Sequence, residues 1–154
     1  MKVLAALAGG LAGAVVLTGI HQVVKKKRGH IAPRMDLLGM ETLIKLGRKA
    51  KINLPDEDTL YQITLAGDLL SNTVYYSTAA IGPKQTWLKG ALLGLGAGVG
   101  AVYLPKPMGL NPDHSNRTEQ TKVLSVVYYL VGGLVAAGVI KLLKAEKVKE
   151  VSSV

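Results

Sequence analysis

A polar stripe runs along the segment 57–81 and holds the residues of this chain best suited to chemistry. The stripe members recur at spacings of three and four residues, which places them on one side of a helix. They are Tyr61, Thr64, Asp68, Ser71, Asn72, Tyr75 and Thr78. The other side of the segment is apolar. A carboxyl group inside a membrane must face protein or water, so Asp68 is a candidate proton carrier, held by Asn72, Tyr75 and Tyr128.

Three apolar stretches surround this stripe and set the fold class. Val123 to Ile140 is a run of 18 residues without a charged side chain, and 3–24 and 91–104 have the same character. A helix of about 20 apolar residues crosses the hydrocarbon of a bilayer. The chain is therefore predicted to be an all-α integral membrane four-helix bundle.

Composition supports a membrane location and excludes several kinds of site. Hydrophobic residues make up 49% of the chain, charged residues only 19%, and mean hydropathy is +0.29. The chain has no cysteine, which excludes disulfides and thiolate metal centres. Nine of the 19 Lys and Arg residues lie between Lys25 and Lys51, so the net charge of +9 is attributed to lipid head groups rather than nucleic acid. The head-group residues are Lys25, Lys26, Lys27 and Arg28.

The predicted elements form a single membrane domain over 1–154. Spanning helices are expected at about 3–24, 57–81, 85–104 and 122–143, with a short amphipathic interfacial helix at about 34–50. A docking helix for a protein partner is the alternative for 34–50. The first segment is interpreted as a retained anchor rather than a signal peptide, because the basic run KKKR follows it at once.

Small residues at four-residue spacing mark the faces on which these helices should pack. Helices in lipid associate mainly through close contact at such positions. The packing residues are Gly9, Gly13, Gly90, Gly94, Gly98 and Gly133. His21 is expected to lie near the head groups, and Asp113 and His114 in a solvated loop.

Charge bias and connection length disagree about the number of spans. With four spans and the amino end outside, twelve Lys and Arg residues lie on the cytoplasmic side and seven outside. If 57–81 only rests on the surface, three helices span, and fifteen Lys and Arg residues lie on the cytoplasmic side against four outside, which the charge bias prefers. The short link at 82–84 is typical of an antiparallel helical hairpin. We therefore favour four spans with the 25–54 loop in the cytoplasm.

The order of these features resembles that of small four-helix bacterial inner-membrane proteins of unknown function. The shared features are a Gly-rich first helix, the segment MDLLGM, a polar second helix, and WLKGALLGLGAG followed by LPKPMGL. The resemblance implies a fold and a bacterial inner (plasma) membrane location, and no activity.

Three functions are compatible with this sequence. The first is a structural or accessory membrane subunit that packs through Gly and Ala ladders, with itself or within a larger membrane complex. The second is a small channel or proton-coupled transporter that uses the stripe centred on Asp68. An enzyme is the least favoured, because His21, His30 and His114 are expected outside the Asp68 layer, and no catalytic constellation, metal site or cofactor is predicted.

Overall fold

The structure is a computed structural model that describes residues 2–82 and 84–152. These residues form α1 (Lys2–Arg28), α2 (Met35–Lys49), α3 (Glu57–Ser77), α4 (Thr86–Tyr103), α5 (Asp113–Asn116) and α6 (Glu119–Ser152), with a 3₁₀ turn at Thr78–Ala80. The described residues include no strand, so the all-α prediction is confirmed. Two of the helical segments, Val3–Arg28 and Glu119–Ala145, are long and apolar enough to cross a membrane.

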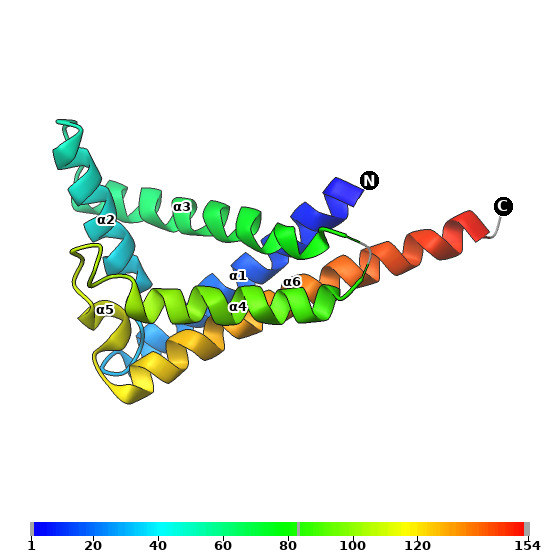
Figure 1. The fold of residues 1–154 in the computed structure, drawn as a ribbon. Coiled ribbons are helices and arrows are strands. Elements are labelled where there is room, and N and C mark those ends of the chain that lie inside the picture. The colour runs from blue at the N-terminus through cyan, green and yellow to red at the C-terminus, as the bar shows by residue number, and fades with distance from the viewer. Residues whose placement is uncertain (1, 83, 153–154) are drawn as a thin grey trace.

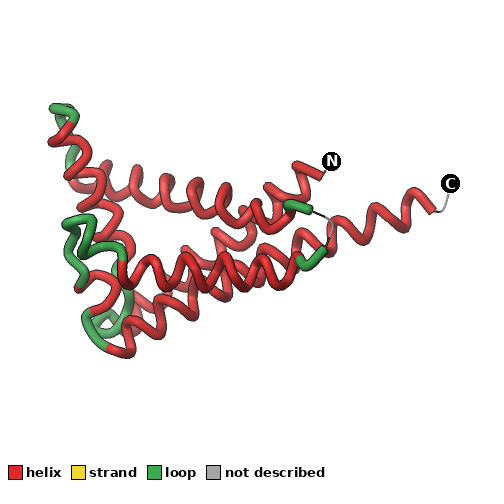
Figure 2. Tube along the Cα trace, viewed as in Figure 1, coloured by secondary structure: helices red, strands yellow, loops and turns green. Residues whose placement is uncertain are grey.

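Four long helices, α1, α3, α4 and α6, run beside one another, and the connections between them lie at two opposite ends (Figures 1 and 2). One end holds the amino terminus, the α3–α4 turn and the distal part of α6. The other end holds α2, α5 and the loops around them. The last helix continues past the predicted end at residue 143, because the residues that follow are mainly Lys, Ala and Glu, which favour helix.

The glycines on α1, α4 and α6 let these three helices meet backbone to backbone. Gly13 of α1 faces the Gly132 carbonyl of α6, and a Cβ at Gly13 would lie only 2.5 Å from that oxygen. A Cβ at Gly94 of α4 would lie 2.6 Å from the Leu130 Cα of α6. Larger residues would force the helices apart, so α6 and its two neighbours form one tightly packed unit. Its backbone contacts use Gly9, Gly13, Gly90, Gly94, Gly98 and Gly133.

Helix α3 lies antiparallel to α1, and side chains link the two helices along their length. Thr18 of α1 bonds to Asp68, and Gln22 accepts a hydrogen bond from Tyr61. At the other end, Gly10 faces the Thr73 carbonyl. Asp56 caps the start of α3 by accepting from the Thr59 amide at 3.0 Å, as the acidic segment before the helix predicts.

Helix α2 crosses the end of the bundle and packs on α3 and α5. Gly39 allows this close approach, since a Cβ there would meet the Thr64 side chain. Lys45 fastens α2 to the loop after α4 by donating to the carbonyl oxygens of Met108 and Gly109, both at 2.9 Å. The helix predicted at 34–50 is thus part of the bundle's end face.

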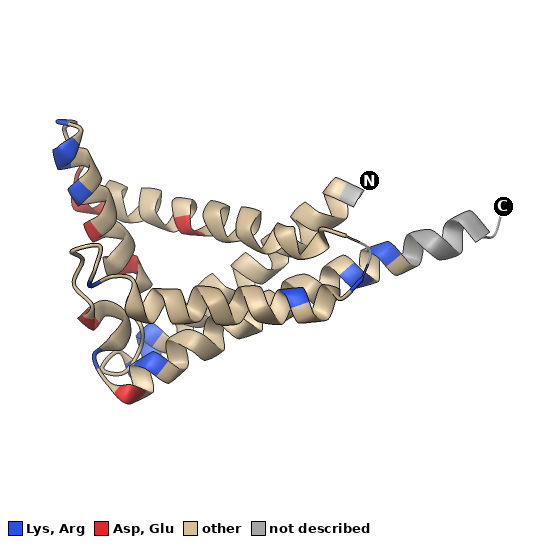
Figure 3. Cartoon of the chain, viewed as in Figure 1, with Lys and Arg blue, Asp and Glu red and all other residues tan. Residues whose placement is uncertain are grey.

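Charged side chains concentrate at the α2 end and along the distal part of α6, whereas the middle of the four long helices is almost free of them (Figure 3). Large apolar side chains are exposed there instead. Examples are Leu11 and Val15 on α1, Leu70 on α3 and Leu92 on α4. The distribution is the reverse of that on a typical protein surface in water.

Candidate functional site

The polar side of α3 turns towards α1 and places Asp68 between the two helices. The carboxyl group of Asp68 accepts hydrogen bonds from Thr18 Oγ1 at 3.3 Å and from Asn72 Nδ2 at 2.9 Å. Asn72 stands one turn after Asp68 on the same helix, so its amide reaches back to the carboxyl group. Among the described residues, the ion pairs do not include Asp68.

A cluster of charges lies about two turns from Asp68, where α1 and α3 meet α2. Asp36 accepts from Lys25 Nζ at 3.1 Å and from Arg34 Nη2 at 2.9 Å. Lys25 also donates to the Tyr61 hydroxyl at 3.3 Å and lies over the Tyr61 ring. Burial by itself raises the pKa of Asp36, but the hydrogen bonds and charges of Arg34 and Lys25 outweigh burial and hold that pKa below its ordinary value.

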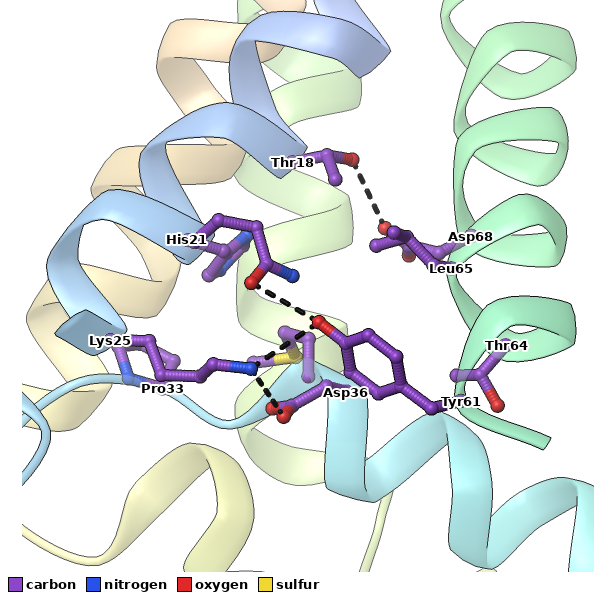
Figure 4. A pocket seen from close by; sticks show the side chains of 11 residues that line it. Thr18, His21, Lys25, Pro33, Asp36, Tyr61, Thr64, Leu65 and Asp68 are labelled. Carbon is purple, nitrogen blue, oxygen red and sulfur yellow. Dashed lines mark hydrogen bonds and ion pairs between the residues drawn. The ribbon is translucent and has the colours of Figure 1, made fainter. Parts of the chain in front are cut away.

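A small, partly enclosed chamber is lined by this cluster and by Asp68 (Figure 4). Its volume of about 20 Å³ is comparable to the space that one water molecule needs. The Tyr61 hydroxyl projects into the chamber between Gln22, Lys25 and Asp36, and the Asp68 carboxyl faces Thr18 across it. Polar groups therefore line a path from the α2 end towards Asp68.

A second and larger cavity is an open cleft between α3 and α4. Its volume is about 620 Å³, and α2 and the loop after α4 close it at one end. One wall is polar, with Asp68, Ser71, Asn72 and Tyr75 of α3, and the facing wall has small residues. Those small residues are Gly96, Ala97, Gly100 and Ala101 of α4. Asp68 lines both cavities and so stands at their boundary.

Two neighbouring tyrosines fix α3 against the other helices. Tyr76 is fully buried and donates to the Tyr129 carbonyl of α6 at 2.8 Å. Tyr75 donates to the Leu93 carbonyl of α4 at 3.1 Å and marks the narrow end of the cleft. These bonds join α3 to α6 and α4 near the 82–85 turn, so the space between α3 and α4 widens towards α2 (Figure 1).

The predicted stripe is divided between the two cavities. Tyr61 and Thr64 line the chamber, Ser71, Asn72 and Tyr75 line the cleft, and Thr78 bonds to the Tyr75 carbonyl outside both. The predictions that Tyr75 and Tyr128 hold Asp68 are wrong, since the Tyr75 hydroxyl donates to the Leu93 carbonyl instead. Tyr128 packs against His21 and lines a different cavity, formed by the end of α1 and the start of α6. Its neighbour Tyr129, one residue later, is the α6 tyrosine that lines the cleft.

His21 was predicted to lie near lipid head groups because it precedes KKKR, but its side chain turns into the protein. Its side chain is 8% exposed, and its ring packs edge-on against Tyr128 and Tyr129. Among the described residues, none bonds to His21 Nε2. His21 lines the chamber with Asp68, so the expectation that every histidine lies outside the Asp68 layer is also wrong.

Lys25 was predicted to contact lipid head groups, but it is engaged by Asp36 and Tyr61. Lys26, Lys27 and Arg28 are exposed and remain candidates for head-group contact. His114 lies within 3.5 Å of Glu41 and is partly covered, whereas Asp113 is exposed. Within the described ranges, no three His, Asp or Glu side chains are grouped so as to hold a metal ion.

Thr18 and Gln22 of α1 and Tyr129 of α6, which line the cavities at Asp68, were not predicted as site residues. Thr18 and Gln22 stand four residues apart on α1, and that spacing places them on one face of the helix. A search for polar residues at this spacing within the apolar segment 3–24 would have found them. The choice between Tyr128 and Tyr129 depends on the rotation of α6, which its nearly uniform apolar sequence does not specify.

Comparison with protein-family models, with curated proteins and with solved structures finds no match for this chain. A carboxyl group beside hydroxyl and amide groups, at the boundary of a cleft, can bind a proton or a cationic group.

Proposed function

We propose that this protein is an integral membrane protein with four spanning helices that serves as a structural or accessory subunit, with α2 at the membrane surface. The observation that carries the proposal is the side-by-side register of the long helices. Residues 61, 68 and 73 of α3 contact residues 22, 18 and 10 of α1, so α3 extends to the same depth as α1. If the apolar α1 crosses the bilayer, α3 crosses it too.

The same reasoning applies to α4 and α6. Gly90, Gly94 and Gly98 of α4 meet successive turns of α6 in the antiparallel direction. Because α6 is long and apolar enough to span, its partner α4 lies at the same depth. Exposed Leu and Val side chains around the bundle would then face acyl chains, and Asp68 would face protein, as a membrane carboxyl group must.

The proposed orientation places residues 25–54 in the cytoplasm of a bacterial cell, with the bundle in the inner membrane. The α2 end carries twelve Lys and Arg residues of the chain by the four-span count, against seven at the other end. Basic residues prefer the cytoplasmic side. The bacterial inner membrane itself is inferred from the resemblance of the sequence.

An accessory role is supported by the contacts of the packing glycines, which lie four residues apart on α1 and α4. They pack α1 and α4 on α6 within one chain and so give a rigid platform with an apolar exterior. Partners would contact that exterior within the bilayer. The proposal includes no catalytic step, since no nucleophile, base and orienting group have been identified together among the described residues.

Single cysteines test the four-span arrangement, because the chain has none of its own. Gln85→Cys and Lys51→Cys lie at opposite ends of the bundle, and both positions are exposed. In intact cells, an impermeant maleimide should label residue 85 and leave residue 51 unlabelled until the membrane is opened. Labelling of both or neither in intact cells would contradict the proposed topology.

The accessory role requires assembly. Mass photometry of the protein extracted directly into native nanodiscs should show particles that hold more than one protein chain. Particles that contain only a single 16.2 kDa chain at native expression levels would contradict this role.

A proton-coupled transporter is the second candidate, and one observation favours it. Asp68 separates the partly enclosed polar chamber from the open cleft, so a proton on Asp68 could be exchanged between the two. Reconstituted vesicles should then show pH-driven flux that Asp68→Asn abolishes. Equal, background-level flux for the wild type and Asp68→Asn would exclude this candidate and leave the accessory role.

A further inference from the structure

We propose that the cleft between α3 and α4 binds a membrane-soluble amphiphile that has an ammonium head group and a single apolar chain. The head group would lie at Asp68 and Asn72, and the chain would lie along the small residues of α4. This inference depends on the proposed membrane location, and it adds a ligand site that an accessory subunit does not require.

The boundaries of the cleft decide what can enter it. At one end, the α3–α4 turn and the bond from Tyr75 to the Leu93 carbonyl bring the helices together. At the other end, Met35, Leu38 and Met108 contribute to a floor, which Lys45 fastens through its two bonds to the loop after α4. The cleft is therefore open to the side, where the proposed topology places acyl chains.

This shape favours a compact ligand over a partner helix. A helix that crosses the bilayer would have to continue past the floor made by α2 and the loop after α4. The volume of about 620 Å³ lies within the range of small-molecule sites, about 300–1,000 Å³. A molecule that enters from the lipid and ends at the floor fits these limits.

The lining indicates the chemistry of the ligand. Polar groups lie on the α3 wall, and the α4 wall and much of the floor are apolar. Asp68 is acidic and, among the described residues, no Lys, Arg or His forms an ion pair with it. An ammonium group donates hydrogen bonds and carries the complementary charge, so it suits a carboxyl group in low-dielectric surroundings better than a hydroxyl or a carboxylate does.

The small residues of α4 that line the cleft differ from those that pack the bundle. A Cβ at Gly96 would lie 3.6 Å from the Tyr75 hydroxyl, an ordinary contact, whereas one at Gly94 would lie 2.6 Å from the backbone of α6. Helix packing therefore explains glycine at position 94 and does not explain it at position 96. Room for an apolar chain along α4 accounts for a small residue at position 96.

The test uses lipid nanodiscs and three single-chain probes with twelve carbons: dodecylamine, dodecanol and dodecanoate. Ala97→Cys places a thiol on the cleft wall, and Leu92→Cys places one on the exposed outer face of α4. Both are labelled with the membrane-permeant N-phenylmaleimide. Dodecylamine should slow labelling at residue 97, with half-protection at about a tenfold lower concentration than dodecanol, as a charge-assisted hydrogen bond implies.

Two variants extend the test. Asp68→Asn should remove the preference for dodecylamine over dodecanol. Gly96→Leu should fill the cleft and reduce the protection by every probe, while the protein keeps its melting temperature. The comparison of probes in the wild-type background does not depend on either variant, so it stands even if a variant fails to fold.

Equal protection by the three probes, or none by dodecylamine, would overturn the proposal. Labelling of residue 97 in the absence of any probe is a further check. If that labelling is slow and becomes faster when the protein is diluted in lipid, a second protein chain occupies the cleft, which would also overturn the proposal. Labelling of residue 92 as fast as that of a thiol in water would instead count against the membrane-spanning arrangement, because a thiol in hydrocarbon stays protonated and reacts slowly with maleimides. Slow labelling at residue 92 that no probe changes, without selective protection at residue 97, counts against the ligand alone.

Discussion

The two sides of this bundle are built in different ways. On one side, α1 and α4 meet α6 through glycines, so closely that Cβ atoms at positions such as 13 and 94 would reach the backbone of the neighbouring helix. On the other side, α3 meets α1 closely at Gly10, which faces the Thr73 carbonyl, but towards α2 the two helices are joined by polar side chains, such as Thr18 with Asp68 and Gln22 with Tyr61. Between α3 and α4 lies a cleft.

This difference shows how a small helical protein can be both rigid and open. Glycine packing brings helices together and leaves no space for a ligand. Along residues 61–75 of α3, where polar side chains make the contacts, cavities remain beside the helix. The cavities at Asp68 lie on the side where polar contacts replace glycine contacts, so the candidate site is a consequence of how α3 packs.

The largest effect should come from adding a side chain to the glycine-packed side. Gly94→Leu would push against the α6 backbone and should lower the free energy of unfolding by about 3 kcal/mol, because the two helices cannot separate locally. Unfolding by SDS titration, followed by circular dichroism, measures this loss. Gly96→Leu is the matched control and should change stability by less than about 1 kcal/mol. Equal losses for the two variants would remove the distinction between the two sides.

A smaller effect is expected from the charge cluster that joins α1, α2 and α3. Asp36→Asn leaves Lys25 and Arg34 without their shared carboxylate and should cost about 2 kcal/mol, since these groups are only partly exposed. The same SDS titration applies. Glu119→Gln removes an exposed ion pair with Lys122 and should leave the unfolding transition almost unchanged, because solvent screens this pair. A cost for Asp36→Asn no larger than that of Glu119→Gln would show that the cluster does not hold α2.

The same cluster predicts a dependence of stability on pH. The pKa of Asp36 is lower in the folded protein than its ordinary value of 3.8, so the unfolded chain binds the proton first as pH falls. The contribution of Asp36 should be complete well above pH 4 and should be lost as pH falls through its folded pKa. Melting temperatures between pH 6 and pH 3 measure this loss. The decline should be shallower in Asp36→Asn, and identical profiles would contradict the assignment.

The smallest predicted effect compares two adjacent tyrosines at the narrow end of the cleft. Tyr76→Phe removes the bond from a fully buried hydroxyl to the Tyr129 carbonyl and should cost about 1 kcal/mol. Tyr75→Phe removes a bond from a side chain that is 37% exposed and should cost only a few tenths of a kcal/mol, because loss of an exposed hydroxyl leaves no internal cavity. Thermal melts of the two variants provide the comparison. A larger loss of stability for Tyr75→Phe than for Tyr76→Phe would show that Tyr75, rather than Tyr76, makes the main contact of α3.

Periodicity and helix-end signals in the sequence predicted the helices well. Asp56 marks the start of α3, although the helix ends at Ser77, before the predicted end at residue 81, and glycines four residues apart indicate which faces of α1 and α4 pack. These signals depend on neighbouring residues in the chain, so they can be recognised without the tertiary structure.

The partners of Asp68 were harder to predict, because they depend on how each helix is rotated. His21 was expected near lipid head groups, yet the rotation of α1 turns it inward against Tyr128 and Tyr129. Lys25 was expected to contact lipid head groups, yet it forms an ion pair with Asp36 of α2. The cleft could not be predicted at all, since it arises where α3 and α4 diverge and α2 closes the space between them.

The central claim is that α3 lies in the bilayer with its apolar side towards lipid and Asp68 towards protein. Nitroxide labels at Leu70→Cys on α3 and Leu92→Cys on α4, in nanodiscs, test it through collisions with oxygen, which is concentrated in lipid, and with a water-soluble nickel chelate. Both positions should be relaxed strongly by oxygen and weakly by nickel. A label at residue 70 that responds mainly to nickel, beside an oxygen-sensitive label at residue 92, would place α3 outside the hydrocarbon and contradict the account.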